Sequence, residues 1–373
     1  MSQTAQRISA TYLVRCSAGD AAARADAIRV EQSVEMLLAG IRDAAILENI
    51  VGKIESITPA SPDAFRITIG LAAQTTAPGI AQMINMLFGN TSLHADVELL
   101  DVQFPDEVLA AYHGPRHGIA GLRQLTGVAS GPLTCTALKP QGLAVPELAA
   151  LARNFALSGM HFIKDDHGIA NQAYAPFAER VPACQAAVVK ANGESGLNAI
   201  YAPTLSGTPS ELFAQARLVR EEGVQAVLIS PMVIGLPVFQ ELVTDHLDAA
   251  VLAHPAMGGA ARIAPELLFG KIFRMLGADA VIFTGYGGRF AWSRERCLAV
   301  ADTCRATFGS FKPAMPVPAG GMKLERVDEL VDFYGTDTML LIGGDLLIAG
   351  DQLLVRGREF AARVAGRANT RSA

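Results

Sequence analysis

The chain has 373 residues, of which 50% are hydrophobic, and its 31 Lys and Arg against 36 Asp and Glu give a formal net charge of −5. This length is enough to bury one large core and a smaller second one. The slightly acidic balance and the lack of a basic run exclude a protein that follows nucleic-acid phosphates, so we expect no nucleic-acid partner.

The first residues, MSQTAQRISATYLVR, lack the basic and apolar pattern of a signal peptide. No stretch approaches the roughly 18 apolar residues that a membrane span requires. We therefore expect a soluble, cytoplasmic protein without a membrane partner. The five cysteines never form a Cys-x-x-Cys pair, so they are expected to be small core residues: Cys16, Cys135, Cys184, Cys297 and Cys304.

Residues 1–124 are expected to form an α+β domain. The runs ISATYLVRC and AFRITIGLA predict strands, whereas ADAIRVEQSVEMLL and PGIAQMINMLFG predict helices. Pro59 and Pro62 indicate a loop between these elements. The glycine-rich piece HGPRHGIAGLRQLTG is expected to connect this domain to the next.

Residues 125–373 are expected to form a (β/α)₈ TIM barrel. Short apolar runs recur in this part and alternate with stretches of helical periodicity such as VPELAALARNFALSG and SELFAQARLVREEG. Eight alternations of this kind predict parallel strands covered by helices on their outer face. The eight runs are LTCTALKP, MHFIKDD, LNAIYAP, QAVLISP, AAVLAHP, DAVIFTG, MPVPAGG and TMLLIGG.

Polar residues and glycine pairs close several of these runs, at the strand ends where barrel enzymes carry their chemistry. They are Lys139 after the first run, Lys164, Asp165, Asp166 and His167 after the second, His254 after the fifth, Gly320 and Gly321 after the seventh, and Gly343 and Gly344 after the eighth.

The row Lys164 to His167 predicts a divalent-cation site. Two adjacent carboxylates repel each other unless a cation neutralises them, and hard cations prefer oxygen ligands. A buried lysine at a strand end loses part of its preference for the charged form, so Lys164 or Lys139 can act as a base or nucleophile. The alternative is a solvated loop with local ion pairs.

His254 and the glycine pairs also have two interpretations. His254 is either a functional group at the barrel mouth or a structural histidine with satisfied hydrogen bonds. The two glycine pairs follow strands seven and eight, where barrel enzymes frequently hold a phosphate on backbone N–H groups. Their alternative is ordinary turn chemistry.

The motifs taken together resemble the large subunit of RuBisCO, and more closely the non-carboxylating RuBisCO-like proteins (form IV). The matching pieces, in order, are VEQS, GPRHGI, LTCTALKPQG, GMHFIKDDHGIANQAYAPFAERV, AHPAM, PVPAGGM and LLIGGD. The resemblance implies a ferredoxin-like N-terminal domain before the barrel and a homodimer with active sites at the subunit interface.

The resemblance also implies roles for individual residues. Lys139 matches the base that starts enolisation, and His254 matches a histidine that assists proton transfer. Lys164 matches the lysine that takes up CO₂ as a carbamate to bind Mg²⁺, and Asp166 matches a metal ligand. Glu31 of VEQS matches a glutamate donated to the partner's active site, and the glycine pairs match one phosphate site.

Several positions depart from RuBisCO. No lysine lies between Lys271 and Lys312, so the loop after strand six, TGYGGRFAW, lacks the lysine that carboxylation requires. Pro255 and Phe283 stand where RuBisCO binds a second phosphate, so we expect a substrate with one phosphate. His167 replaces a glutamate ligand and admits Mn²⁺ as an alternative metal.

Three smaller departures follow. Gln141 replaces the second lysine of the strand-one motif, and Ala319 replaces the serine before the first glycine pair. Arg289 is a possible substitute cation for the substrate, or a surface residue. Asp165 is a second possible substrate contact.

We therefore expect Mg²⁺-dependent enolisation of a singly phosphorylated keto-sugar or keto-sugar acid. Decarboxylation of the 3-oxo-isoapionate 4-phosphate type ranks first, because losing CO₂ from a 3-oxo acid reverses the carboxylation of an enediolate. The alternatives are a 5-methylthioribulose-1-phosphate isomerase or a diketo-methylthiopentyl-phosphate enolase of methionine salvage. A hypothesis of another class is a catalytically silent binding barrel.

Overall fold

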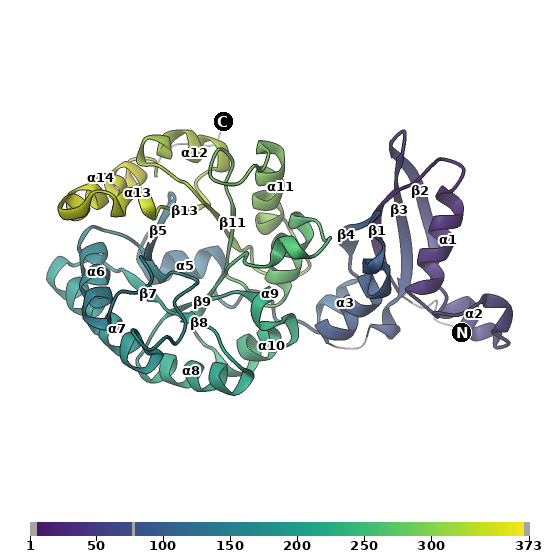
Figure 1. Ribbon diagram of the computed structural model, residues 1–373, viewed down its shortest axis with the longest axis horizontal. Helices are drawn as coiled ribbons and strands as arrows, with labels where there is room; N and C mark the ends of the chain where they lie inside the picture. Colours follow the sequence, from purple (N-terminus) through teal and green to yellow (C-terminus); the bar gives the residue numbers. More distant parts are fainter. Residues whose placement is uncertain (1–5, 77–78, 369–373) are drawn as a thin grey trace. The chain divides into compact units, whose positions relative to one another are not determined.

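The computed structural model describes residues 6–76 and 79–368. Its backbone forms two compact units (Figure 1). One comprises Met1–Tyr112 with Gly258–Leu268, and the other comprises His113–Met257 with Phe269–Ala373. The domain boundary after residue 124 stays a prediction.

The N-terminal unit is built on a four-stranded antiparallel sheet with the strand order β2-β3-β1-β4. Along the chain its main elements are β1 (Arg7–Arg15), α1 (Ala21–Glu31), β2 (Lys53–Ser61), β3 (Ala64–Ala72), α3 (Ile80–Phe88) and β4 (Val97–Gln103), with the short helices α2 (Ala44–Asn49) and α4 (Asp106–Leu109). This chain order and strand order are those of a ferredoxin-like fold, as expected.

One hydrogen bond holds α3 to the sheet of this unit, and another holds α1 to α3. The hydroxyl of Tyr12, which is fully buried on β1, donates a hydrogen bond to the Leu87 carbonyl at the end of α3 (2.6 Å). The side chain of Gln32, just after α1, donates to the Met86 carbonyl (2.8 Å), which ties α1 to α3.

Two sequence-based expectations for this unit are wrong in detail. The helix predicted over residues 25–38 ends at Glu31, and Glu35 has a positive φ of 52°, which no helix continues through. The loop predicted around Pro59 is part of strand β2. Proline is tolerated there because β2 is an edge strand, which needs fewer N–H donors. Pro78, at the start of the other predicted helix, lies outside the described residues.

The second unit is the predicted barrel, and each of the eight predicted runs contains one of its strands. These are β5 (Leu133–Leu138), β6 (Phe162–Asp165), β7 (Ile200–Ala202), β9 (Ala226–Ile229), β10 (Ala250–Ala253), β11 (Ala280–Thr284), β12 (Met315–Ala319) and β13 (Met339–Leu341), with a short extension of β7 named β8 (Thr204–Leu205). All of the strand pairs are parallel.

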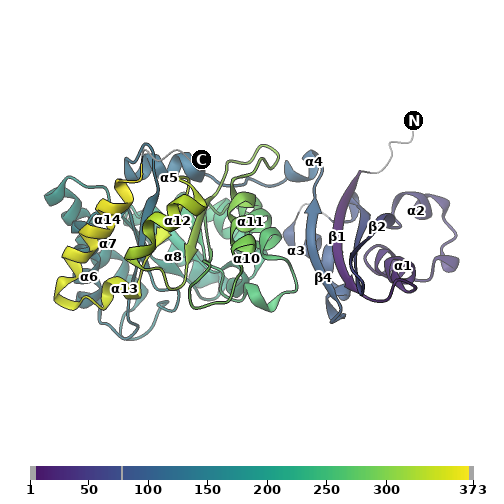
Figure 2. The ribbon, with the colours of Figure 1, turned by 90° about the horizontal axis from the view of Figure 1, so that it is seen from above.

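Helices form the outer layer around these strands (Figures 1 and 2). They are α6 (Val145–Leu157), α7 (Phe177–Ser195), α8 (Pro209–Glu221), α9 (Pro231–Ile234), α10 (Leu236–Glu241), α11 (Arg294–Arg305), α12 (Val327–Tyr334), α13 (Gly344–Leu347) and α14 (Leu353–Ala365), with π-helical segments at Leu242–His246 and Glu266–Phe273. Helix α5 (Gly118–Thr126) precedes the first strand.

The barrel interior is a packed core rather than a channel. Side chains at alternate positions along each strand point inward, for example Leu133 and Cys135 on β5 and Phe162 on β6. Ile119 and Leu122 of α5 pack against the same core. No helix among residues 6–76 and 79–368 is long and apolar enough to cross a membrane.

Strand pairing around the barrel is interrupted between β12 and β13. β12 pairs with β11 and β13 pairs with β5, but β12 and β13 share no ladder although they lie side by side. The Met315 N–H donates toward β11, so the alternate residues Pro316 and Pro318 face β13. Because proline has no N–H, β12 offers no backbone donor to β13.

Candidate active site

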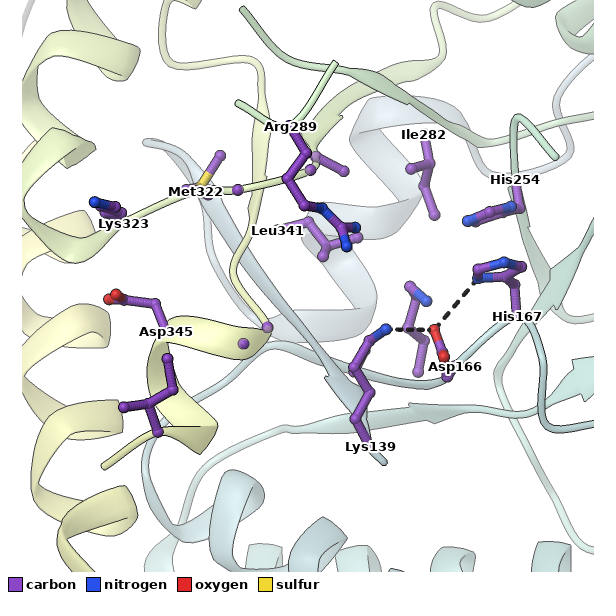
Figure 3. Close-up of a pocket in the computed structure, with 18 residues that line it drawn as sticks. Lys139, Asp166, His167, His254, Ile282, Arg289, Met322, Lys323, Leu341 and Asp345 are labelled. Atoms are coloured by element: carbon purple, nitrogen blue, oxygen red, sulfur yellow. Dashed lines mark ion pairs between the residues drawn. The ribbon is translucent and has the colours of Figure 1, made fainter. Parts of the chain in front are cut away.

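A cavity of about 420 Å³ opens at the carboxyl ends of the barrel strands (Figure 3). Its lining includes ten residues that the sequence singled out: Lys139, Lys164, Asp166, His167, His254, Arg289, Gly320, Gly321, Gly343 and Gly344. These ten residues come from six separate segments of chain that meet at one site, as expected for a barrel enzyme.

Because side chains alternate along β6, Asp165 and Asp166 point to opposite sides of the strand. Phe162 and Lys164 point into the barrel, and Asp166 continues this inward set into the cavity. Asp165 points the other way and is fully buried behind the strand. It accepts hydrogen bonds from Arg180 (3.1 Å) and Tyr201 (2.8 Å) and does not line the cavity.

Asp166 is the centre of the polar end of the cavity. Its Oδ1 lies 2.9 Å from Lys139 Nζ and 3.3 Å from His167 Nδ1, and Figure 3 shows both side chains directed at this oxygen. Burial alone would raise the pKa of Asp166, but hydrogen bonds from His167 and Lys139 and the charge of Lys164 lower it well below its ordinary value. Asp166 is therefore a carboxylate under all ordinary conditions.

Lys164 lies deeper in the same wall and is only 3% exposed. Its Nζ donates to the backbone oxygen of Asp165 (3.0 Å). Burial lowers the pKa of the Lys164 amine, and the negative charge of Asp166 offsets this only in part. A lysine of this kind has an increased neutral fraction, which is the form that reacts with electrophiles.

His254 closes the polar end from the side of β10. Its ring stacks on His167 with the centroids 4.1 Å apart and the planes at 15°. The Nδ1 atom of His254 accepts a hydrogen bond from the Ala256 N–H (3.2 Å), so the neutral ring carries its proton on Nε2. Burial and the nearby Lys164 charge lower the pKa of His254 to about 2, so it is neutral at physiological pH.

The glycine pairs line another part of the cavity. A Cβ atom at Gly343 or Gly344 would meet no protein atom within 4 Å, so backbone borders open space there. The loop after β11 packs on the other pair, where the Arg289 N–H donates to the Gly320 oxygen (3.0 Å). This contact anchors the Arg289 backbone, and Figure 3 shows its side chain reaching into the cavity.

Several lining residues were not anticipated from the sequence. Lys323 and Asp345 follow the two glycine pairs and lie at the opposite end of the view in Figure 3 from the two histidines. The remaining wall is apolar and is formed by Ala137, Ile282, Ala319, Met322, Leu341 and Ile348. Lys323 is two residues past Gly321, and a search extended beyond each glycine pair would have found it.

Phe283 and Pro255, which stand where RuBisCO binds a second phosphate, do not line the cavity. Ile282 faces the cavity, whereas Phe283 points out of the barrel and packs edge-on against Tyr334, with ring centroids 6.0 Å apart. Neighbouring residues of a strand face opposite sides, so a shift of one position exchanges the two faces. Pro255 is not among the lining residues.

Glu31 lies in the N-terminal unit, as the last residue of α1. Its Oε1 accepts a hydrogen bond from the Asn90 side chain (2.8 Å). Its role across a dimer stays a prediction.

The donor set of the cavity fits a divalent cation under one condition. Asp166 and His167 converge, but no group of three His, Cys, Asp or Glu suited to a metal occurs in the part of the chain that the structure describes. A third ligand must come from elsewhere, and Lys164 beside Asp166 would supply oxygen atoms once carbamylated. Its burial and lowered pKa fit this modification.

The chain is similar to known proteins over most of its length. Residues 118–368 match the model of the ribulose bisphosphate carboxylase large chain, catalytic domain. The chain is 48% identical to ribulose bisphosphate carboxylase-like protein 1 of Rhodopseudomonas palustris, covering 96% of this chain and 98% of that one. It is 49% identical to 5-methylthioribulose-1-phosphate isomerase of Rhodospirillum rubrum, covering 97% of both.

The fold agrees equally well with a solved structure. The crystal structure of a RuBisCO-like protein from Rhodopseudomonas palustris superposes with a TM-score of 0.92 at 45% identity, covering 98% of this chain and 99% of that one. The motifs, the barrel and the catalytic-domain match point to one conclusion. The chain belongs to the RuBisCO large-chain family and is an enzyme of its RuBisCO-like branch.

Proposed function

We propose that this enzyme isomerises 5-methylthioribulose 1-phosphate, or a close analogue, by Mg²⁺-dependent enolisation. The observation that carries the proposal is the division of the cavity: Lys139 and Asp166 form a polar end, and Ile282, Met322 and Leu341 form an apolar wall. A methylthio group suits such a wall. The 49% identity to an enzyme named for this reaction supports isomerisation over the decarboxylation that the sequence ranked first.

Asp166, His167 and a carbamylated Lys164 would hold the cation, which is Mg²⁺ or alternatively Mn²⁺. When bound, it would supply positive charge beside the carbonyl and hydroxyl oxygens of the substrate. Carbamylation requires CO₂ and the neutral amine, and it turns Lys164 from a cation into an anion. Asp166 and Lys164 would then both favour a divalent cation.

In its neutral form, Lys139 is proposed to remove a proton from the carbon next to the substrate carbonyl. Its amine lies at the cavity surface beside Asp166, within reach of a bound substrate. Return of the proton to the neighbouring carbon moves the carbonyl by one position and completes the isomerisation. His254 carries a proton on Nε2 and is proposed to shuttle it to and from the substrate oxygens.

The phosphate is proposed to bind at the two glycine pairs, with Lys323 and Arg289 supplying charge. One such site would suit a substrate with one phosphate. We further propose that the enzyme acts as a homodimer in which Glu31 of one copy completes the active site of the other.

Decarboxylation of a 3-oxo-isoapionate 4-phosphate type substrate is retained as a second candidate because of one observation. Arg289 reaches into the cavity in addition to Lys323, and a guanidinium pairs well with a carboxylate. Enolisation of a diketo-methylthiopentyl phosphate is a variant of the first proposal, and the enolase of Geobacillus thermodenitrificans is 34% identical over 74% of this chain.

NMR in D₂O with Mg²⁺ and bicarbonate tests these proposals. A shifted carbonyl and deuterium at carbon in 5-methylthioribulose 1-phosphate would support the isomerase. Release of CO₂ from 3-oxo-isoapionate 4-phosphate, without turnover of the first substrate, would support the decarboxylase instead. A protein that binds these compounds without exchange or turnover would be the catalytically silent barrel.

A further inference from the structure

Behind the polar end of the cavity lies a buried ion pair that the proposed chemistry does not use. Arg180 of α7 and Asp165 of β6 are both fully buried. The Arg180 Nε atom donates to Asp165 Oδ2 at 3.1 Å. A buried charge pair of this kind is a poor source of stability, because desolvation cancels much of the attraction. A contribution to stability therefore does not by itself explain why this pair is present.

Arg180 uses its remaining donors on the segment that follows β6. Its two terminal nitrogens donate to the Ala175 oxygen (2.6 Å) and the Ala170 oxygen (2.8 Å). This segment begins with Asp166 and His167. One guanidinium thus fixes both the end of β6 and the loop that carries the two candidate metal ligands.

Asp165 in turn connects β6 to the next strand. Its carboxylate accepts hydrogen bonds from the Tyr201 hydroxyl (2.8 Å) and the Thr204 N–H (3.1 Å). The Thr204 hydroxyl donates to the backbone oxygen of Asp166 (3.2 Å). The Asp165 carboxylate and its bonds lie on the side of β6 that faces away from the cavity.

From these contacts we infer that Arg180 and Asp165 are positioning residues, which hold Lys164, Asp166 and His167 in register for binding a divalent cation. The inference rests on the proposed metal site. Neither residue touches the cavity, so they act only through the backbone and through their neighbours along the chain. Outer partners of this kind typically change metal affinity by about 10–100-fold when they are removed.

Arg180→Lys is the primary variant, since it keeps the charge but loses the fork of donors that reaches Asp165, Ala170 and Ala175. Arg274→Lys is the matched control. Arg274 is also buried and donates from all three nitrogens, to the backbone oxygens of Lys312, Ala306 and Phe311, and none of these residues lines the cavity. Both variants should lose thermal stability to a similar extent.

Calorimetric titration with Mg²⁺ in bicarbonate, below both melting temperatures, separates the two roles. We expect about a tenfold or greater loss of Mg²⁺ affinity in Arg180→Lys, a lower kcat with a nearly unchanged KM, and wild-type Mg²⁺ affinity in Arg274→Lys. Equal Mg²⁺ affinities in Arg180→Lys and the wild type would overturn the inference.

Tyr201→Phe keeps the test decisive if Arg180→Lys does not fold. It removes a single hydrogen bond to Asp165 and should weaken Mg²⁺ binding in the same direction by a smaller factor, and unchanged binding would count against positioning. Failure of the proposed function is a different result, because the wild type itself would then show no bicarbonate-dependent Mg²⁺ binding.

Discussion

Asp165 and Asp166 are consecutive in the chain, yet their carboxylates lie on opposite sides of strand β6. Asp165 pairs with Arg180 behind the strand, and Asp166 pairs with Lys139 in the cavity. Each acid therefore has its own cation, and the mutual repulsion that the adjacent acids suggest is largely avoided. Asp166 is therefore available for chemistry in the cavity, whereas Asp165 has a structural role behind the strand.

Replacing Lys139 by Met should stop proton removal while leaving the fold intact. Lys139 is partly exposed, but its partner Asp166 is buried, so the variant should also lose some stability because a buried carboxylate loses one of its partners. We expect deuterium exchange into substrate to fall by about 100-fold or more in a protein that still folds, with a modestly lower melting temperature. Exchange at the wild-type rate would remove Lys139 from its proposed role as the base.

Replacing Lys164 by Met should abolish the dependence of Mg²⁺ binding on bicarbonate. The same change should leave the protein as stable or more stable by about 1 kcal/mol, because a buried amine with one hydrogen bond is exchanged for an apolar chain. Urea unfolding and Mg²⁺ titration measure the two effects. Bicarbonate-linked binding that persists in this variant would contradict carbamylation.

Gly344→Ala tests the phosphate site. A Cβ at Gly344 meets no protein atom, so the variant should fold normally, but its methyl group would occupy the cavity. We expect substrate KM to rise about tenfold or more, since backbone donors need close approach. Gly193→Ala, an exposed glycine of α7 that also has open space, is the control and should bind substrate like the wild type.

Mixing two inactive variants tests the shared active site. Glu31→Gln and Lys139→Met remove groups that the proposal places in the same site but on different copies. After subunit exchange, one site of each mixed dimer would be intact, so about a quarter of the wild-type activity should return. Activity that stays at the level of the separate variants would show that Glu31 does not serve the partner copy.

Stability at mild acid pH should depend on His161. Burial, with the Arg123 charge, lowers the pKa of His161 to about 4, and its Nδ1 accepts a hydrogen bond from the Thr134 N–H (3.0 Å). Between pH 6.5 and 4, His161 is therefore protonated in the unfolded chain but neutral in the folded protein. Stability is fully present above pH 6.5 and falls as the pH drops toward 4.

This loss should amount to at most about 3 kcal/mol, reduced by solvent screening. His161→Asn retains an acceptor but does not titrate, so its unfolding free energy in urea should change less between pH 6.5 and 4. An identical pH dependence in the variant and the wild type would show that other groups cause the loss.

The sequence predicted the barrel well because buried parallel strands are apolar on both faces. A run such as AVLIS or AVLA needs no register to be recognised as a strand. The sequence did not predict the register of each strand. Register determines that Ile282, and not Phe283, faces the cavity. Both are apolar, so composition does not distinguish the inward position from the outward one.

The site residues on strand ends were predictable because their chemistry stands out against apolar surroundings. The Arg180 network was not, because it depends on a contact between residues 15 positions apart that cross from strand to helix. Lys323 was not predicted as a cavity residue because it follows a turn whose direction the sequence does not reveal. Tertiary placement, rather than residue type, was missing in both cases.

The two prolines of β12 have a consequence for how ligand and barrel depend on each other. Pro316 and Pro318 leave β12 and β13 without a shared ladder, and the glycine pairs stand at the ends of these two strands. A phosphate held by both pairs would bridge the ends of two neighbouring strands that share no ladder. Bound substrate would then connect β12 to β13. Without substrate, we expect local opening of the barrel to begin between these two strands.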